Sequence, residues 1–164
     1  MMNLSKDNRW PEPSHLDVCS RFDPCSATRI RCDVRTKLHD AGVRLTSERL
    51  ELAQLLFEHG DRHFTPDALY EEAQQKGIQI SLATIYNNLK LFLDVGLLKR
   101  LSIDSPKAWY DTNVSEHYHF YCEEEDRVFD VDDSQISFVK MPPIPGGLEV
   151  SRIEVVLRLK RKSA

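Results

Sequence analysis

The sequence predicts an α+β protein with two structured units, a helical unit over residues 33–110 and a small α/β unit over residues 111–164. Two observations lead to this prediction. Capped helical segments followed by glycine come first, and short strand-like runs dominate from residue 97 onward. A chain of 164 residues, 41% hydrophobic and 29% charged, has the size and composition of one ordinary or two small globular domains, which excludes large multidomain enzymes.

Residues 1–32 are predicted to be a mobile N-terminal extension, because Pro11, Pro13 and Pro24 interrupt a polar stretch without hydrophobic periodicity. The extension lacks the apolar core of a signal peptide, and no run of the chain approaches 18 apolar residues. We therefore expect a cytoplasmic protein without membrane contact. The cysteines include no Cys-x-x-Cys pair, so we expect reduced thiols at Cys19, Cys25, Cys32 and Cys122.

Four helices are predicted in the first unit, at about Thr28–Ala41, Thr46–His59, Thr65–Lys76 and Ser81–Val95. The last three begin at a Ser or Thr that can cap them, and each of the four is followed by glycine. Apolar residues at helical spacing define the faces that we expect to be buried. These residues are Leu52, Leu55, Leu56, Leu69, Ala73, Leu82, Ile85, Leu89 and Phe92 or Leu93.

Two strand-like runs, at about 97–103 and 108–110, flank the turn 104–107 and predict a β-hairpin. Helices followed by a hairpin are the order of a winged helix, in which one helix enters the major groove of DNA, although other small α/β domains share this order. In the last helix Thr84, Asn87 and Asn88 form a polar side flanked by Tyr86. This side either contacts bases and phosphates or is an ordinary solvated helix face.

The second unit begins with alternating residues at 117–122, an acidic turn at 123–126 and a returning strand at 128–131. A last strand is predicted at 148–159, and a short helix near 133–140. These elements are too few for a stable monomeric core, so we expect this unit to dimerise.

The formal net charge of −4 is unevenly distributed along the chain. Residues 1–28 carry −1, residues 29–109 carry +1, residues 110–140 carry −7 and residues 141–164 carry +3. The acidic balance therefore belongs mainly to one late segment, and the nearly neutral helical unit is compatible with DNA binding.

Histidines two positions apart suggest a metal site in the second unit. On a strand, His117 and His119 leave the same face, so both imidazoles can bind one divalent cation. Cys122, Asp111 and Asp130 are nearby candidate ligands, although both aspartates could equally be solvated surface charges. No nucleophile elbow or phosphate-binding loop is present, so we expect no enzyme; a small metal-dependent hydrolase is a remote alternative.

Several motifs resemble one known family. The runs GVRLTSER (42–49), HFTPDALY (63–70), SLATIYNNL (81–89) and GLL (96–98) resemble the DNA-binding domain of the ferric uptake regulator (Fur) family. The resemblance covers about residues 34–160. The runs LFEHGDRH (56–63), YDTN (110–113), HYH (117–119) and VSRIEVVLRL (150–159) are most similar to the iron response regulator (Irr) branch of this family.

The family resemblance implies a homodimeric repressor or activator with an N-terminal winged-helix DNA-binding domain, a small C-terminal α/β dimerisation domain and an A·T-rich operator on double-stranded DNA. Tyr86 and Asn87 would face bases, and Arg44 would enter the minor groove. Because Asn87 replaces an arginine common in the family, the operator should differ from a standard Fur box. The expected phosphate ligands are Thr46, Arg49, Ser81 and Thr84.

The resemblance also implies one metal site between the two domains, holding Zn, Fe or Mn with His63, Asp111, His117, His119 and Asp130. We expect no structural four-cysteine zinc, because Glu125 replaces the cysteine that would pair with Cys122. The Irr branch implies a regulator of iron and haem homeostasis that is active under iron limitation and inactivated by haem. His117 or His119 would then be one axial haem ligand, and haem-delivering proteins would be partners. The alternative is a Fur-type repressor with a divalent metal as co-repressor.

Overall fold

The computed structural model describes residues 34–131, 136 and 141–161. The predicted extension at 1–32, with three of the four cysteines, and all but one residue of the predicted helix near 133–140 lie outside the described residues. A first helix covers residues 34–40. The remaining elements are α2 (Ser47–Phe57), β1 (His63–Phe64), α3 (Pro66–Gln75), α4 (Leu82–Asp94), β2 (Lys99–Arg100), β3 (Tyr110–Asp111), β4 (Tyr118–Cys122), β5 (Arg127–Val131) and β6 (Val156–Leu159).

The helices begin where the capping residues predicted them. The side-chain oxygens of Thr46, Thr65 and Ser81 each accept a hydrogen bond from the backbone N–H three residues later. After α3 and α4, Gly77 and Gly96 have φ angles of 73° and 72°, in the left-handed region that favours glycine. The predicted helix boundaries are therefore confirmed to within about two residues over the described part of the chain.

The helices enclose one hydrophobic core. Leu52, Leu56, Leu69, Ile85 and Phe92 are almost fully buried there, as the helical spacing predicts. The expectation that Asn88 points outward is wrong. Asn88 lies on the inner side of α4, one turn before Phe92, and its amide is buried because other residues satisfy it with hydrogen bonds.

The structure has two small sheets, of which the first includes β1 from between α2 and α3. The first has the order β1-β3-β2, with both pairs antiparallel, so the antiparallel pairing of the predicted hairpin is confirmed. The predicted strand at 97–103 is wrong in length, because only Lys99–Arg100 forms a strand, and the second strand is Tyr110–Asp111 instead of 108–110. The strand β1, only two residues long, was not predicted because it is too short for any alternation to appear. The boundary predicted at residues 110/111 falls inside β3, which joins the two parts of the chain.

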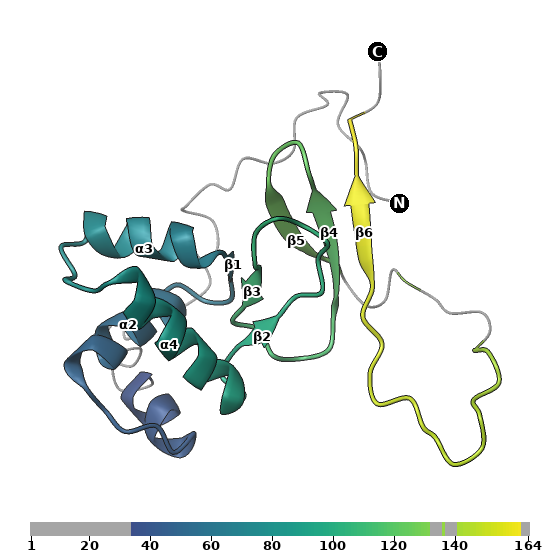
Figure 1. The fold of residues 1–164 in the computed structure, drawn as a ribbon, viewed down its shortest axis with the longest axis horizontal. Helices are drawn as coiled ribbons and strands as arrows, with labels where there is room; N and C mark the ends of the chain where they lie inside the picture. Colours follow the sequence, from purple (N-terminus) through teal and green to yellow (C-terminus); the bar gives the residue numbers. More distant parts are fainter. Residues whose placement is uncertain (1–33, 132–135, 137–140, 162–164) are drawn as a thin grey trace, which may run out of the picture.

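The second sheet has the order β5-β4-β6, with β4 antiparallel to β5 and parallel to β6. The predicted strand at 148–159 is wrong in length, because only Val156–Leu159 forms a strand. Its partner strand β4 begins at Tyr118, and the register pairs His119 with Val156, so the residues before β6 have no strand to pair with. In Figure 1 the β1-β3-β2 sheet lies between the helices and the β5-β4-β6 sheet.

Ion pairs and apolar contacts join the hairpin to the second sheet. Lys107 in the hairpin turn pairs with Asp126, and Arg158 of β6 pairs both with Asp104 in the hairpin turn and with Glu123 in the turn after β4. Leu101 and Trp109 pack with Tyr121 and Val128. The acidic turn after β4 is thus balanced by cations from the hairpin and the C-terminal strand, which accounts for part of the charge asymmetry in the sequence.

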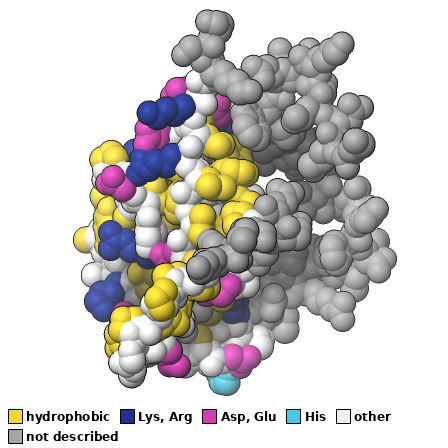
Figure 2. Space-filling model, turned by 90° about the vertical axis from the view of Figure 1, so that its right-hand side faces the viewer, with side chains coloured by type: hydrophobic (Ala, Val, Ile, Leu, Met, Phe, Trp, Pro, Cys, Tyr) yellow, Lys and Arg dark blue, Asp and Glu magenta, His cyan; other side chains and the backbone are white. Residues whose placement is uncertain are grey.

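A series of large apolar side chains remains exposed between residues 141 and 157, comprising Met141, Ile144, Leu148, Val150, Ile153 and Leu157. In Figure 2, which views the molecule from the right-hand side of Figure 1, hydrophobic side chains gather next to charged ones. Among the helices of the described residues, none is long and apolar enough to cross a membrane.

Phe92 offers a test of the helical core. Replacing this fully buried ring in α4 with alanine leaves a cavity, and we expect a loss of about 3–5 kcal/mol in the free energy of unfolding. Tyr86→Ala, in the same helix at a side chain that is 43% exposed, is the matched control and should change it by less than about 0.5 kcal/mol. Urea unfolding followed by circular dichroism measures both; equal losses would contradict this core assignment.

Candidate metal centre and candidate nucleic-acid interface

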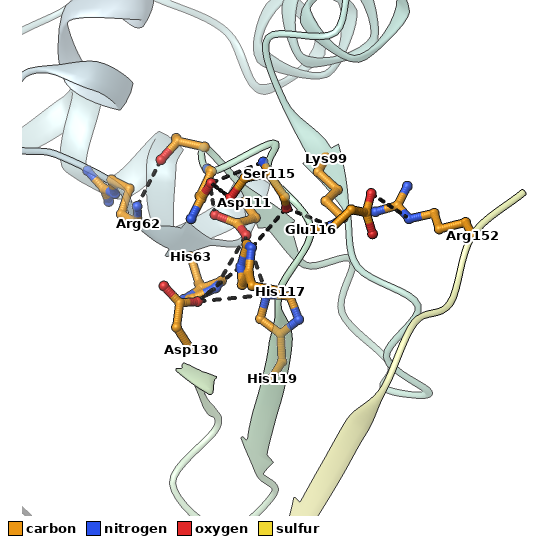
Figure 3. Close-up of polar contacts among 12 residues, drawn as sticks. Arg62, His63, Lys99, Asp111, Ser115, Glu116, His117, His119, Asp130 and Arg152 are labelled. Carbon is orange, nitrogen blue, oxygen red and sulfur yellow. Dashed lines mark hydrogen bonds and ion pairs between the residues drawn. The ribbon is translucent and has the colours of Figure 1, made fainter. Parts of the chain in front are cut away.

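Five side chains converge where the two sheets meet. His63 comes from β1, Asp111 from β3, His117 from the residue before β4, His119 from β4 and Asp130 from β5. One ligand atom from each lies within 4.8 Å of the corresponding atoms of the other four. Figure 3 shows the imidazoles and carboxylates directed toward one another. The structure therefore brings together all five residues that the sequence predicted as metal ligands.

Strand register explains this convergence. His63 pairs with Asp111 across β1 and β3, and His119 pairs with Asp130 across β4 and β5. Side chains of directly paired residues leave the same face of a sheet at close distance. Each sheet thus contributes one histidine and one aspartate, and His117 lies on the same face as His119 because two positions separate them.

The same two carboxylate oxygens face all three imidazoles. Asp111 Oδ2 lies 3.0 Å from His117 Nε2, 3.4 Å from His119 Nε2 and 3.6 Å from His63 Nε2. Asp130 Oδ1 lies 3.0, 3.2 and 3.8 Å from the Nε2 atoms of His63, His117 and His119. The arrangement is a cluster of five donor atoms rather than separate ion pairs.

Two of these nitrogens are buried without a hydrogen bond. His63 Nε2 and His117 Nε2 lie close to carboxylate oxygens, yet neither has a hydrogen-bond partner in the structure. Buried polar atoms in folded proteins are normally satisfied. A cation bound among the five donor atoms would satisfy both nitrogens and balance both carboxylates, so the residues fit a metal ion.

Contacts outside the cluster orient its ligands. The Ser115 carbonyl can only accept, so His117 Nδ1, 2.9 Å away, donates to it, and this contact directs Nε2 of the same ring toward the cluster. Asp111 Oδ1 accepts from the Asn113 N–H at 2.8 Å, which leaves Oδ2 directed at the imidazoles. The sequence alone did not identify Ser115 or Asn113.

The charges of the cluster are strongly coupled. Burial would raise the pKa of Asp111, but contacts with His119 and His63 and the Asn113 N–H hold it well below its usual range. His63 lowers the pKa of Asp130. Burial would lower the pKa of His63, but its contacts with Asp111 and Asp130 outweigh burial and raise that pKa to about 9. Without a metal, a proton on His63 therefore balances part of the carboxylate charge.

The donor set indicates the chemistry of the ion. Three imidazole nitrogens and two carboxylate oxygens, without sulfur, suit divalent zinc, iron and manganese. Cys122 is buried as a free thiol, but it does not belong to the five-residue cluster. The cluster can bind a cation across both sheets.

The residues expected to contact DNA lie around α2 and α4. Arg44, Thr46, Ser81, Tyr86 and Asn87 are exposed, whereas Arg49 and Thr84 are half-buried. The Ser81 and Thr84 hydroxyl oxygens lie 2.8 Å apart. Arg49 is already engaged within the protein, because its Nε donates to Asn88 Oδ1 at 3.1 Å and its Nη1 to the Arg44 carbonyl at 2.9 Å. The inner position of Asn88 had a signal in the sequence, since it lies three residues after Ile85 and four before Phe92.

The raised pKa of His63 gives a pH-dependent stability to the metal-free protein. A raised pKa contributes stability that is complete below the unfolded value of 6.5 and disappears as the pH rises through about 9. In the presence of a chelator we expect the free energy of unfolding to fall by up to about 3 kcal/mol between these pH values.

Urea unfolding at several pH values measures this loss. His63→Gln should remove the fall in the free energy of unfolding with rising pH. His59→Gln, at an exposed histidine, should leave this pH dependence as in the unmodified protein. A stability that does not fall between pH 6.5 and 9 in the unmodified protein would show that His63 holds no proton there.

Comparisons with known proteins identify the family. The model of the ferric uptake regulator family matches residues 40–155. The peroxide-responsive repressor PerR of Staphylococcus epidermidis is 36% identical over 103 residues, which cover 63% of this chain and 68% of that protein.

Two solved structures share the fold. The ferric uptake regulator of Pseudomonas aeruginosa with manganese has a TM-score of 0.61 and 24% identity, covering 79% of this chain and 98% of its own. The ferric uptake regulator of Vibrio cholerae has a TM-score of 0.62 and 22% identity, and the match covers 77% of this chain and 98% of that chain. Because the family model matches well over half of the sequence, this chain belongs to the ferric uptake regulator family, whose members are metal-dependent transcription regulators and not enzymes.

Proposed function

We propose that this protein is a DNA-binding transcription regulator whose affinity for its operator depends on a divalent metal held by His63, Asp111, His117, His119 and Asp130. The observation that carries the proposal is the convergence of these side chains from two different sheets. A bound cation supplies a positive charge that all five donor atoms can coordinate at once.

The site offers a physical route from metal to DNA. His63 directly precedes Phe64, which packs in the helical core, and Asp111 lies on β3, which pairs with β2 of the hairpin. His119 and Asp130 belong to the second sheet. When all five residues hold one ion, the helices and hairpin are fixed relative to the second sheet, and a ligand that favours one arrangement shifts the population toward it.

The proposed DNA-binding domain is a winged helix. The helices α3 and α4 form its helix-turn-helix, and β2 and β3 form its wing. Tyr86 and Asn87 reach base edges in the major groove, and Arg44 enters the minor groove of an A·T-rich operator. Thr46, Ser81 and Thr84 lie near phosphates. The exposed apolar series at residues 141–157 supports a homodimer formed through the second unit.

Of the two predicted signals, the geometry favours a divalent metal over haem. His117 and His119 direct Nε2 at the same two carboxylate oxygens, with ring centroids 4.5 Å apart. Neighbouring positions suit one small cation, whereas haem iron offers two positions on opposite sides of the porphyrin. The PerR of Staphylococcus epidermidis is a peroxide-responsive repressor, so the Irr branch, haem and haem-delivering partners stay predictions. The cytoplasmic location also stays a prediction.

Binding to DNA with and without metal tests the proposal. An operator is first selected from random duplex DNA with Mn-loaded protein, and fluorescence anisotropy then measures affinity for the metal-free, Mn, Fe(II), Zn and haemin-treated forms. We expect at least one divalent ion to raise the affinity about ten-fold or more, with a steep dependence on salt.

Variants of the site separate metal sensing from folding. His117→Ala and Asp130→Asn should abolish the response to metal while the circular dichroism spectrum stays that of the unmodified protein, and His59→Ala is the exposed control. If the metal-free protein binds tightly and only haemin releases it, haem is the signal. The same anisotropy measurement on Fe(II)-loaded protein treated with hydrogen peroxide tests whether peroxide changes DNA affinity, since the PerR relative is named as peroxide-responsive.

A further inference from the structure

A chain of hydrogen bonds links the segment before α2 to α4 inside the helical unit. Arg49 Nε donates to Asn88 Oδ1 at 3.1 Å, and Asn88 Nδ2 donates to the Thr84 carbonyl at 2.9 Å. Arg49 Nη1 also donates to the Arg44 carbonyl at 2.9 Å. One guanidinium therefore contacts both α4 and the backbone of Arg44, although 39 positions separate Arg49 from Asn88.

The buried amide of Asn88 is chemically matched to this position. Its side chain donates to a carbonyl and accepts from a guanidinium, which fixes the orientation of the amide. Aspartate could accept from Arg49 but would place an oxygen against the Thr84 carbonyl, and leucine could do neither. Because Asn88 is only 6% exposed, an unpaired polar group here would be costly.

We propose that Arg49 and Asn88 form an internal brace that sets the position of Arg44 relative to the exposed residues of α4, so that Arg49 acts as a positioning residue and not as a phosphate ligand. The brace matters because Arg44 and Asn87 would have to reach different grooves of the same DNA segment at once. The consequence for DNA rests on the proposed function; the brace itself does not.

The substitution Arg49→Lys separates the two roles. A lysine keeps the positive charge, so a phosphate contact would largely survive, but a lysine cannot contact Asn88 and the Arg44 carbonyl with the planar fork of arginine. The brace therefore predicts that Arg49→Lys and Arg49→Ala both weaken operator binding, by about ten-fold or more. A phosphate role predicts near-normal binding for Arg49→Lys alone.

The salt dependence gives a second readout. A lost phosphate contact reduces the slope of log affinity against log salt by about one per contact, whereas a lost positioning contact lowers affinity at an unchanged slope. We expect an unchanged slope for Arg49→Ala and Asn88→Ala, and a reduced slope for Arg44→Ala. Asn87→Ala, at the neighbouring exposed amide, is the matched control and should change the preferred base sequence.

Thermal unfolding tests the brace independently of DNA. Arg49→Ala and Asn88→Ala should each lower the melting temperature, and the double variant should lose less than the sum of the two losses. Additive losses, or a reduced salt slope for Arg49→Ala, would overturn the brace. If the unmodified protein binds no DNA with any metal while the losses remain non-additive, the brace holds and the proposed function fails.

Discussion

The carboxylate of Asp111 is only 1% exposed, and the rest of the site depends on how its negative charge is balanced. A buried ion without a partner is costly in free energy, so the surrounding residues must supply positive charge or hydrogen bonds. The Asn113 N–H satisfies one oxygen, while three imidazoles surround the other. Without a metal, a proton on His63 supplies part of the balance, and a divalent cation at the five-residue site would supply more.

The five-residue cluster around the Asp111 carboxylate lies at the boundary between two packed units. The first sheet extends from the helical core, and the second sheet carries His119 and Asp130. The pairs Lys107–Asp126 and Arg158–Asp104 link the hairpin turn to the second sheet, but they lie at the surface, where such pairs contribute little. The largely buried cluster, together with the buried apolar contacts of Leu101 and Trp109 with Tyr121 and Val128, therefore does more than these ion pairs to set how the two units are oriented, which is the property that a metal-responsive regulator has to control.

The helical unit also contains a buried polar group whose hydrogen bonds are satisfied within the protein. The amide of Asn88 and the guanidinium of Arg49 satisfy each other below the exposed side of α4, leaving Tyr86 and Asn87 accessible. The residues that we propose to contact DNA, and Asn88, which we propose to help position them, are thus neighbours in sequence with different exposure.

Local interactions made much of the fold predictable from sequence. Thr46, Thr65 and Ser81 mark helix starts because each cap acts within three residues, and the apolar spacing of Leu52, Ile85 and Phe92 reflects the helical period itself. The family motifs also pointed to all five residues of the cluster. Only the tertiary structure decided the rest, because the partners are distant in sequence. Asn88 finds its partner because Arg49 reaches it from another helix, β6 is short because β4 offers no earlier partner, and His63 meets Asp130 only where two sheets join.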